Sequence, residues 1–89
     1  MAEFLVEVYL SRGNAVDASA AQARRAAEEL TDEGTPVRYL NSIFVPEDET
    51  CFFLYHAASA DDVREAARRA SLSFERVSEA VAESKGVLP

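Results

Sequence analysis

The chain has 89 residues and a formal net charge of −7, from 16 acidic and 9 basic side chains. This length allows one hydrophobic core, and the negative charge repels nucleic-acid phosphates and anionic lipid head groups. No apolar run approaches the roughly 20 residues that span a bilayer, and residues 1–3 lack the basic start of a secretory signal. We therefore expect a cytoplasmic protein without nucleic-acid or membrane partners.

Alanine dominates the apolar residues. They make up 48% of the chain, but 16 of them are alanine, so few large side chains are left to fill a core. A domain this small with so little large apolar surface is only marginally stable alone, and we expect a homodimer. The single cysteine, Cys51, cannot form an internal disulfide or a Cys-x-x-Cys metal site. It is expected to pack as a small apolar residue.

The first half of the chain predicts a strand followed by a helix. Residues 4–10 are rich in β-branched and aromatic side chains, which is typical of a strand whose side chains alternate between two faces. Ser19 and Gln22 have the spacing of a capping box, so the helix should begin near residues 18–20. Gly34 marks its end.

The second half predicts two strands, a helix and a last strand. Residues 37–45 and 50–57 should pair as an antiparallel hairpin around the acidic turn 46–49. The second of these strands is apolar on both faces, as expected in the middle of a sheet. A helix begins after Ser59, and residues 76–83 fit a weak edge strand.

This order of elements predicts an α+β fold of the ferredoxin-like βαββαβ type, with a four-stranded antiparallel sheet and two helices on one face. The domain should cover residues 1–84, and residues 85–89 form a C-terminal tail. The other sheet face has no helix, so its apolar side chains must meet a ligand, a partner or a second copy. A dimer closed sheet against sheet is the simplest arrangement.

Two polar residues stand out in the predicted central strands. His56 is the only histidine, and it could carry a proton, bind a metal or make a local hydrogen bond at its strand end. Glu7 interrupts an apolar strand and needs a partner, for which Arg38, Asn41 and His56 are the candidates. Strand alternation gives the hypothesis that Glu7 and His56 share the open face.

Carboxylate and imidazole ligands suit nickel, zinc or manganese. One histidine per chain is too few for most closed metal sites, but a site shared across a dimer axis would double the ligands. Glu7 and His56 are therefore the candidate metal ligands. The candidate ligand-binding residues of the open face are Glu7, Tyr9, Tyr39, Asn41, Tyr55 and His56.

Two other functions fit the same fold. One is a cofactor-free enzyme of the dimeric α+β barrel type, such as a monooxygenase, cyclase or isomerase, with His56 or Glu7 as proton carrier. It would need a closed apolar cavity of at least about 300 Å³ beside His56, lined by Tyr9, Tyr39, Phe53 and Tyr55. The other is a protein-interaction module without a pocket. An RNA-recognition module is disfavoured because residues 50–56 lack the basic residue and glycines of its third-strand motif.

Several segments resemble a known family. Residues 4–7, 37–42 and 62–70, with Tyr55 and Ala57, are similar to a small bacterial ferredoxin-like family of unknown function, some members of which are described as nickel-binding. The resemblance covers about residues 3 to 81. It implies the ferredoxin-like fold, a homodimer, and nickel or another divalent metal as the bound ion.

The chain departs from the family pattern at three positions. His56 stands where a glutamate commonly follows the tyrosine, Ala66 stands where a histidine often occurs, and Ser71 stands where a glycine usually ends the second helix. The resemblance therefore implies no metal ligands residue by residue, although Glu7 matches the family pattern.

Overall fold

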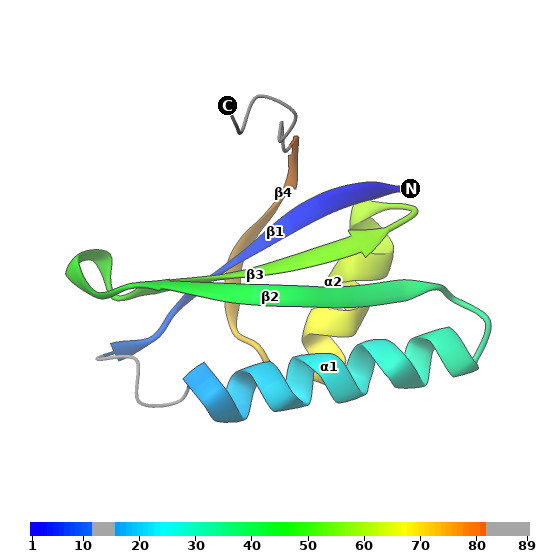
Figure 1. Ribbon diagram of the computed structural model, residues 1–89, viewed down its shortest axis with the longest axis horizontal. Helices are drawn as coiled ribbons and strands as arrows, with labels where there is room; N and C mark the ends of the chain where they lie inside the picture. The colour runs from blue at the N-terminus through cyan, green and yellow to red at the C-terminus, as the bar shows by residue number, and fades with distance from the viewer. Residues whose placement is uncertain (12–15, 82–89) are drawn as a thin grey trace, which may run out of the picture.

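The computed structural model describes residues 1–11 and 16–81. Its four strands form one antiparallel sheet in the order β2-β3-β1-β4. Figure 1 shows the succession of elements, which is β1 (Ala2–Tyr9), α1 (Val16–Asp32), β2 (Val37–Val45), the 3-10 helix η2 (Pro46–Asp48), β3 (Thr50–Ala57), α2 (Ala60–Arg69) and β4 (Phe74–Ala80). The predicted ferredoxin-like α+β fold is confirmed. The predicted tail at 85–89 lies outside the described residues.

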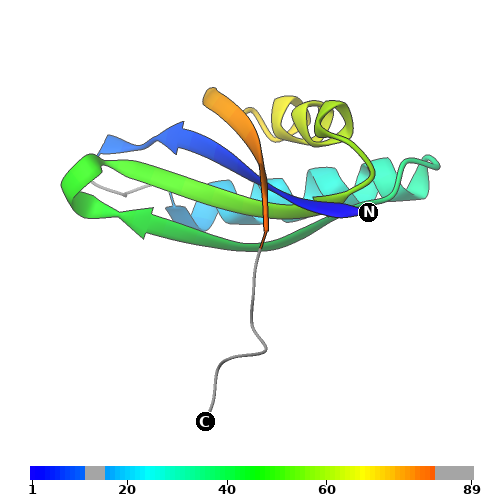
Figure 2. The same ribbon diagram turned by 90° about the horizontal axis from the view of Figure 1, so that it is seen from above.

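Strand alternation separates a helix-covered face from an open face. In β3 the side chains of Phe53 and Tyr55 are buried, whereas those of Phe52, Leu54 and His56 are half-exposed. Figure 2 shows both helices on one side of the sheet. We call the side without helices the open face. The prediction that β3 is apolar on both faces is confirmed, and the described residues cover only one of these faces.

Small side chains join the helices to the sheet. The inner surface of α1 is made of alanines and Leu30, and that of α2 of alanines and Val63. Small side chains let a helix lie close to the sheet, where large rings such as Phe53 and Tyr55 fill the space. Cys51 is buried with them, as expected. No helix in the described part of the chain is long and apolar enough to cross a membrane.

The ends of the helices confirm some sequence signals and correct one. The Ser59 hydroxyl accepts a 3.2 Å hydrogen bond from the Asp62 N–H and caps α2. Gly34, two residues after the end of α1, has a φ of 107°, a backbone conformation that residues with a side chain rarely adopt. The prediction that α1 begins near residues 18–20 was wrong, because the helix begins at Val16 and Ser19 lies within it. Alanine, the strongest helix former, favours this longer helix.

The predicted limits of the first and last strands also need correction. The first strand begins at Ala2 instead of residue 4, because Ala2 and Glu3 pair with the end of β3. The last strand covers Phe74–Ala80 instead of 76–83, since Phe74 pairs with Val8 and packs on the core. Residues 82 and 83 of the predicted strand lie outside the described residues. The prediction of an edge strand is confirmed.

The charged side chains of α2 lie on the solvent side, as their spacing predicts. Arg69 pairs with Glu65 on its own helix and donates two hydrogen bonds, each 2.8 Å long, to the Glu33 carboxylate just after α1. Hydrogen bonding from Arg69 lowers the pKa of Glu33. This network joins the C-terminal ends of the two helices.

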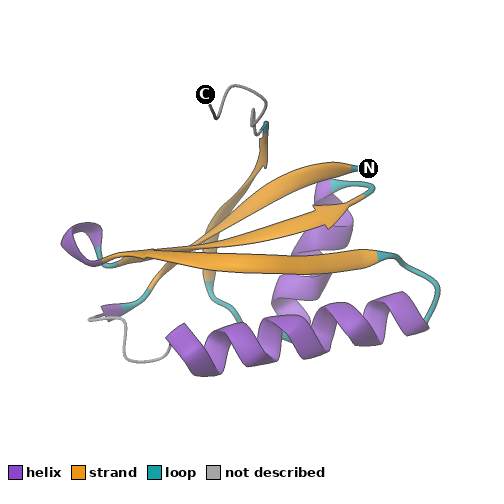
Figure 3. Cartoon of the chain, viewed as in Figure 1, coloured by secondary structure: helices purple, strands orange, loops and turns teal. Residues whose placement is uncertain are grey.

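The outer strand β2 has two irregular features. The Thr31 hydroxyl donates a 2.9 Å hydrogen bond to the Val37 carbonyl and accepts one of 3.1 Å from the Val37 N–H. Further along, the pairing of β2 with β3 shifts between Tyr39 and Asn41, as in a β-bulge. The Thr31 side chain of α1 thus satisfies the peptide N–H and C=O groups of Val37, the first residue of β2. The bulge interrupts the regular pairing in the middle of β2. Figure 3 shows η2 at the turn of the β2 and β3 hairpin.

Candidate functional site

One end of the open face brings two candidate ligand side chains together. Glu3 of β1 lies directly opposite His56 of β3. The Glu3 Oε2 atom is 3.8 Å from His56 Nδ1, and each side chain is 34% exposed. Arg38 of β2 lies opposite His56 on its other side. An imidazole and a carboxylate are therefore neighbours at a solvent-accessible position.

Glu7 lies elsewhere on the same face. It is four residues from Glu3 along β1 and opposite Phe52, which places it about 13 Å from the row of His56. Its Oε1 atom is 3.3 Å from the Arg76 Nε atom of β4. The partners predicted for Glu7 were therefore wrong. Strand β1 lies between β3 and β4, so Arg38 and Asn41 of β2 are not on a neighbouring strand, and the β1–β3 register places His56 opposite Glu3. The structure does not bring Glu7 and His56 to one site within a chain.

The middle of the open face is apolar. Leu5, Phe52 and Leu54 are half-buried on the two central strands, and Ile43 of β2 is 56% exposed opposite Phe52. The predicted ligand residue Asn41 is exposed on this face, opposite Leu54. An apolar surface flanked by Glu3 and Glu7 could pack against another protein surface.

Tyr9 is the last residue of β1, whereas Glu3 is near the start of the same strand. Its hydroxyl donates a 2.8 Å hydrogen bond to Glu49 Oε1. This hydrogen bond and the negative charge of Glu49 raise the pKa of Tyr9. The Tyr9 side chain is thus held at the turn after η2, away from His56.

Tyr39 and Tyr55 lie on the helix-covered face. Their rings meet edge to face with centroids 5.8 Å apart. Tyr55 is completely buried, and its hydroxyl has no hydrogen-bond partner within the described residues. Phe53 is also buried on this side, 6.5 Å from the Tyr39 ring. The expectation that Tyr39 and Tyr55 line the open face was wrong: adjacent residues of a strand point to opposite faces, so Tyr55 cannot share a face with His56.

Tyr55 leads to a prediction about alkaline pH. Burial, and secondarily the neighbouring Tyr39, raise the pKa of Tyr55 above its ordinary value of 10.0. A raised pKa means that the unfolded chain releases this proton first, so stability falls as pH rises above about 10. We expect Tyr55→Phe to reduce this fall, and to leave stability at pH 7 unchanged or raised by up to about 1 kcal/mol, since it removes an unpaired hydroxyl.

Urea unfolding between pH 7 and 11 measures this effect. Tyr9→Phe is the comparison variant. The pKa of Tyr9 is also raised, by Glu49, but its side chain is exposed, so Tyr9→Phe should reduce the alkaline fall less than Tyr55→Phe does. An equally steep alkaline loss in wild type and Tyr55→Phe would contradict the prediction.

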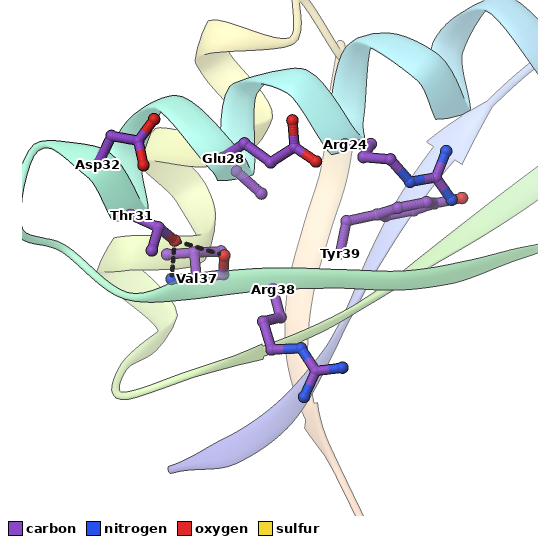
Figure 4. A pocket seen from close by; sticks show the side chains of 8 residues that line it. Arg24, Glu28, Thr31, Asp32, Val37, Arg38 and Tyr39 are labelled. Carbon is purple, nitrogen blue, oxygen red and sulfur yellow. Dashed lines mark hydrogen bonds between the residues drawn. The ribbon is translucent and has the colours of Figure 1, made fainter.

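Two cavities lie outside the open face. One, of about 270 Å³, lies between α1 and β2 and is lined by residues that include Arg24 and Tyr39 (Figure 4). The other, of about 230 Å³, is lined by α1 residues together with Arg69, Ala70 and Ser71. Neither is lined by His56 or Glu7. They differ from the apolar cavity beside His56 that the enzyme alternative requires.

Two residues of these sites were missed by sequence reasoning. Glu3 shares a face with Glu7 by strand alternation, but only the strand register shows that it, rather than Glu7, meets His56. Arg24 lies over the Tyr39 ring, 5.1 Å from its centroid. No signal in the sequence indicates that contact between a helix and a strand.

The described residues contain no cluster of three or more His, Cys, Asp or Glu side chains able to hold a metal ion. Residues 4–80 match the model of the family described as nickel responsive protein SCO4226-like. The chain belongs to this SCO4226-like family. The recognition made from the sequence is confirmed, and the matched segment includes His56 and Glu7 but not Glu3.

A solved relative has the same fold. The crystal structure of SCO4226 from Streptomyces coelicolor A3(2) aligns over 93% of this chain and 100% of its own, with a TM-score of 0.69 and 20% sequence identity. No curated protein matches the chain.

Proposed function

We propose that the chain is a nickel-binding protein that acts as a homodimer, and that Glu3 and His56 bind the metal on the open face. The observation that carries the proposal is the cross-strand pair itself, with Nδ1 and Oε2 3.8 Å apart and partly exposed. The description of the SCO4226-like family as nickel responsive supports the choice of metal. Glu3 thereby takes the role that the sequence suggested for Glu7.

The chemistry of the pair fits a divalent transition metal. Imidazole nitrogen and carboxylate oxygen are both ligands of nickel. Their 3.8 Å separation is less than twice a metal–ligand bond of about 2.1 Å, so both atoms can reach one ion. Because the described part of one chain offers no third ligand nearby, a second copy would supply the other histidine and carboxylate.

The apolar middle of the open face supports the second copy. Leu54, Phe52 and Ile43 present large apolar side chains to solvent on the same face as the Glu3 and His56 pair, and Leu54 is two residues from His56 along β3. Packing this surface against the same surface of another chain removes it from water. A two-fold axis that passes close to the Glu3 and His56 end of this face would bring the two metal-binding pairs toward each other.

Calorimetric titration with NiCl₂ tests the metal site. We use the untagged protein in a buffer that does not bind metals, and expect one nickel ion per two chains. His56→Ala and Glu3→Gln should each weaken nickel binding by at least about 100-fold. Removing a residue that only hydrogen-bonds to a metal ligand already lowers metal affinity by about 10- to 100-fold, and removing a ligand itself should cost more. The matched control is Glu7→Gln, which removes a carboxylate of the same face but not of the pair.

The controls decide between a built site and binding to scattered surface carboxylates. Unchanged nickel affinity in both His56→Ala and Glu3→Gln would overturn the proposed site. Equal losses in Glu3→Gln and Glu7→Gln, with no loss in His56→Ala, would indicate that nickel binds through the general negative charge of the surface.

Sedimentation equilibrium tests the dimer. Ile43→Glu places a charge on the open face at a position that is 56% exposed in one chain, so the protomer should still fold. We expect the dimer dissociation constant to rise at least about tenfold. Val81→Glu is the matched control, because Val81 is 90% exposed after β4. Equal association of both variants would exclude the open face as the interface.

A further inference from the structure

The cavity between α1 and β2 is a mixed apolar and charged site that the metal proposal does not use. It has a volume of about 270 Å³, close to the lower limit for small-molecule pockets. Ala27, Val37 and Tyr39 supply its apolar lining. Figure 4 shows Arg38 pointing away from α1, so its charge belongs to the opposite side of β2.

Arg24 holds its charge at one end of this cavity. Its guanidinium lies over the face of the Tyr39 ring, 5.1 Å from the centroid (Figure 4). Arg69 and Arg76 pair with carboxylates, whereas Arg24 forms no ion pair with any described residue. Stacking on an aromatic ring orients the planar guanidinium and leaves its N–H groups available for a carboxylate.

Two carboxylates continue the same face of α1. Glu28 and Asp32 follow Arg24 at steps of four residues, which places the three side chains in a row along the cavity. Successive positions are about 6 Å apart along the helix axis. Neither carboxylate forms an ion pair or hydrogen bond within the described residues. Thr31, between them, already bonds to the Val37 backbone.

We propose that this cavity binds a small zwitterion, an ω-amino carboxylate with about three methylene groups between its charged ends. The ligand carboxylate accepts hydrogen bonds from the Arg24 guanidinium, and its ammonium group pairs with Glu28, with Asp32 beyond. The methylene groups lie on Ala27 and Val37. The row of one positive and two negative side chains favours such a molecule over a simple anion, which the two carboxylates repel.

Titration with γ-aminobutyrate, followed by amide chemical shifts of ¹⁵N-labelled protein, tests the site. The expected dissociation constant is about 1–10 mM, as suits a ligand with few atoms. The shifts should concentrate at residues 24–32 and 37–39. Butyrate and n-butylamine, which each lack one charge, should bind at least about tenfold more weakly.

Variants connect binding to the named side chains. Arg24→Gln should weaken γ-aminobutyrate binding at least about tenfold, whereas Arg25→Gln, on the same helix but outside this cavity, should not. No shift at these residues, equal binding of butyrate, or unchanged binding by Arg24→Gln would each overturn the proposal. His56→Ala should leave this binding intact, so failure of the nickel site and failure of this site are separate results.

Discussion

Replacing Phe53 with alanine should lower the free energy of unfolding by about 3–5 kcal/mol. Phe53 is fully buried in β3, beside the Tyr39 ring. Apart from Leu30 and Val63, the buried side chains of the two helices are alanine methyl groups, which are too short to fill the space, so the cavity would largely persist. A domain of this size has only about 5–15 kcal/mol of stability. Urea unfolding followed by circular dichroism measures the loss.

The matched control is the neighbouring phenylalanine. Phe52 has the same side chain, but it is half-exposed on the open face. Phe52→Ala should cost the isolated protomer only about 1 kcal/mol, and its larger effect should be on the stability of the proposed dimer. If both variants lost the same free energy at low protein concentration, the assignment of the two faces would be incorrect.

Enlarging a helix alanine should also have a large effect. Ala23 is fully buried in α1. Ala23→Leu should lower the free energy of unfolding by about 1–3 kcal/mol, because the added atoms must push the helix from its neighbours or adopt a strained rotamer. Thermal and urea unfolding measure this loss.

Ala21→Leu is the control for the change of residue type. Ala21 is exposed on the same helix, so the substitution should alter stability by no more than about 0.5 kcal/mol. A wild-type stability for Ala23→Leu would show that the contact between α1 and the sheet is not tightly packed.

Much of the fold could be predicted because alternation and small-residue spacing are local signals. The strand limits at 37–45 and 50–57 were both correct, since each strand is bounded by turn residues and carries large apolar side chains. The start of α1 was not, because Ser19 can cap a helix or lie inside one, and helix-forming alanines decided the outcome. The assignment of both Tyr55 and its neighbour His56 to the open face failed because adjacent residues of a strand point to opposite faces of the sheet.

The candidate site could not be predicted in full, because the distances between side chains on different strands do not follow from the local sequence pattern. Alternation correctly placed Glu7 and His56 on the open face, but it could not say how far apart they lie along the sheet. The register of β1 and β3 decided that His56 meets Glu3. Likewise, the neighbour of Glu7 followed from the position of β4 in the sheet. The contact of Arg24 with Tyr39 required the packing of a helix on a strand.

The Thr31 bonds and the bulge of β2 also limit how copies can assemble. An unmodified outer strand offers its free N–H and C=O groups to an identical strand, which permits open-ended polymers and fibres. Here the first such groups are already occupied at Val37, and the shift after Tyr39 breaks the regular repeat that a continuing ladder needs. Addition of an identical strand along this edge of the sheet is therefore disfavoured.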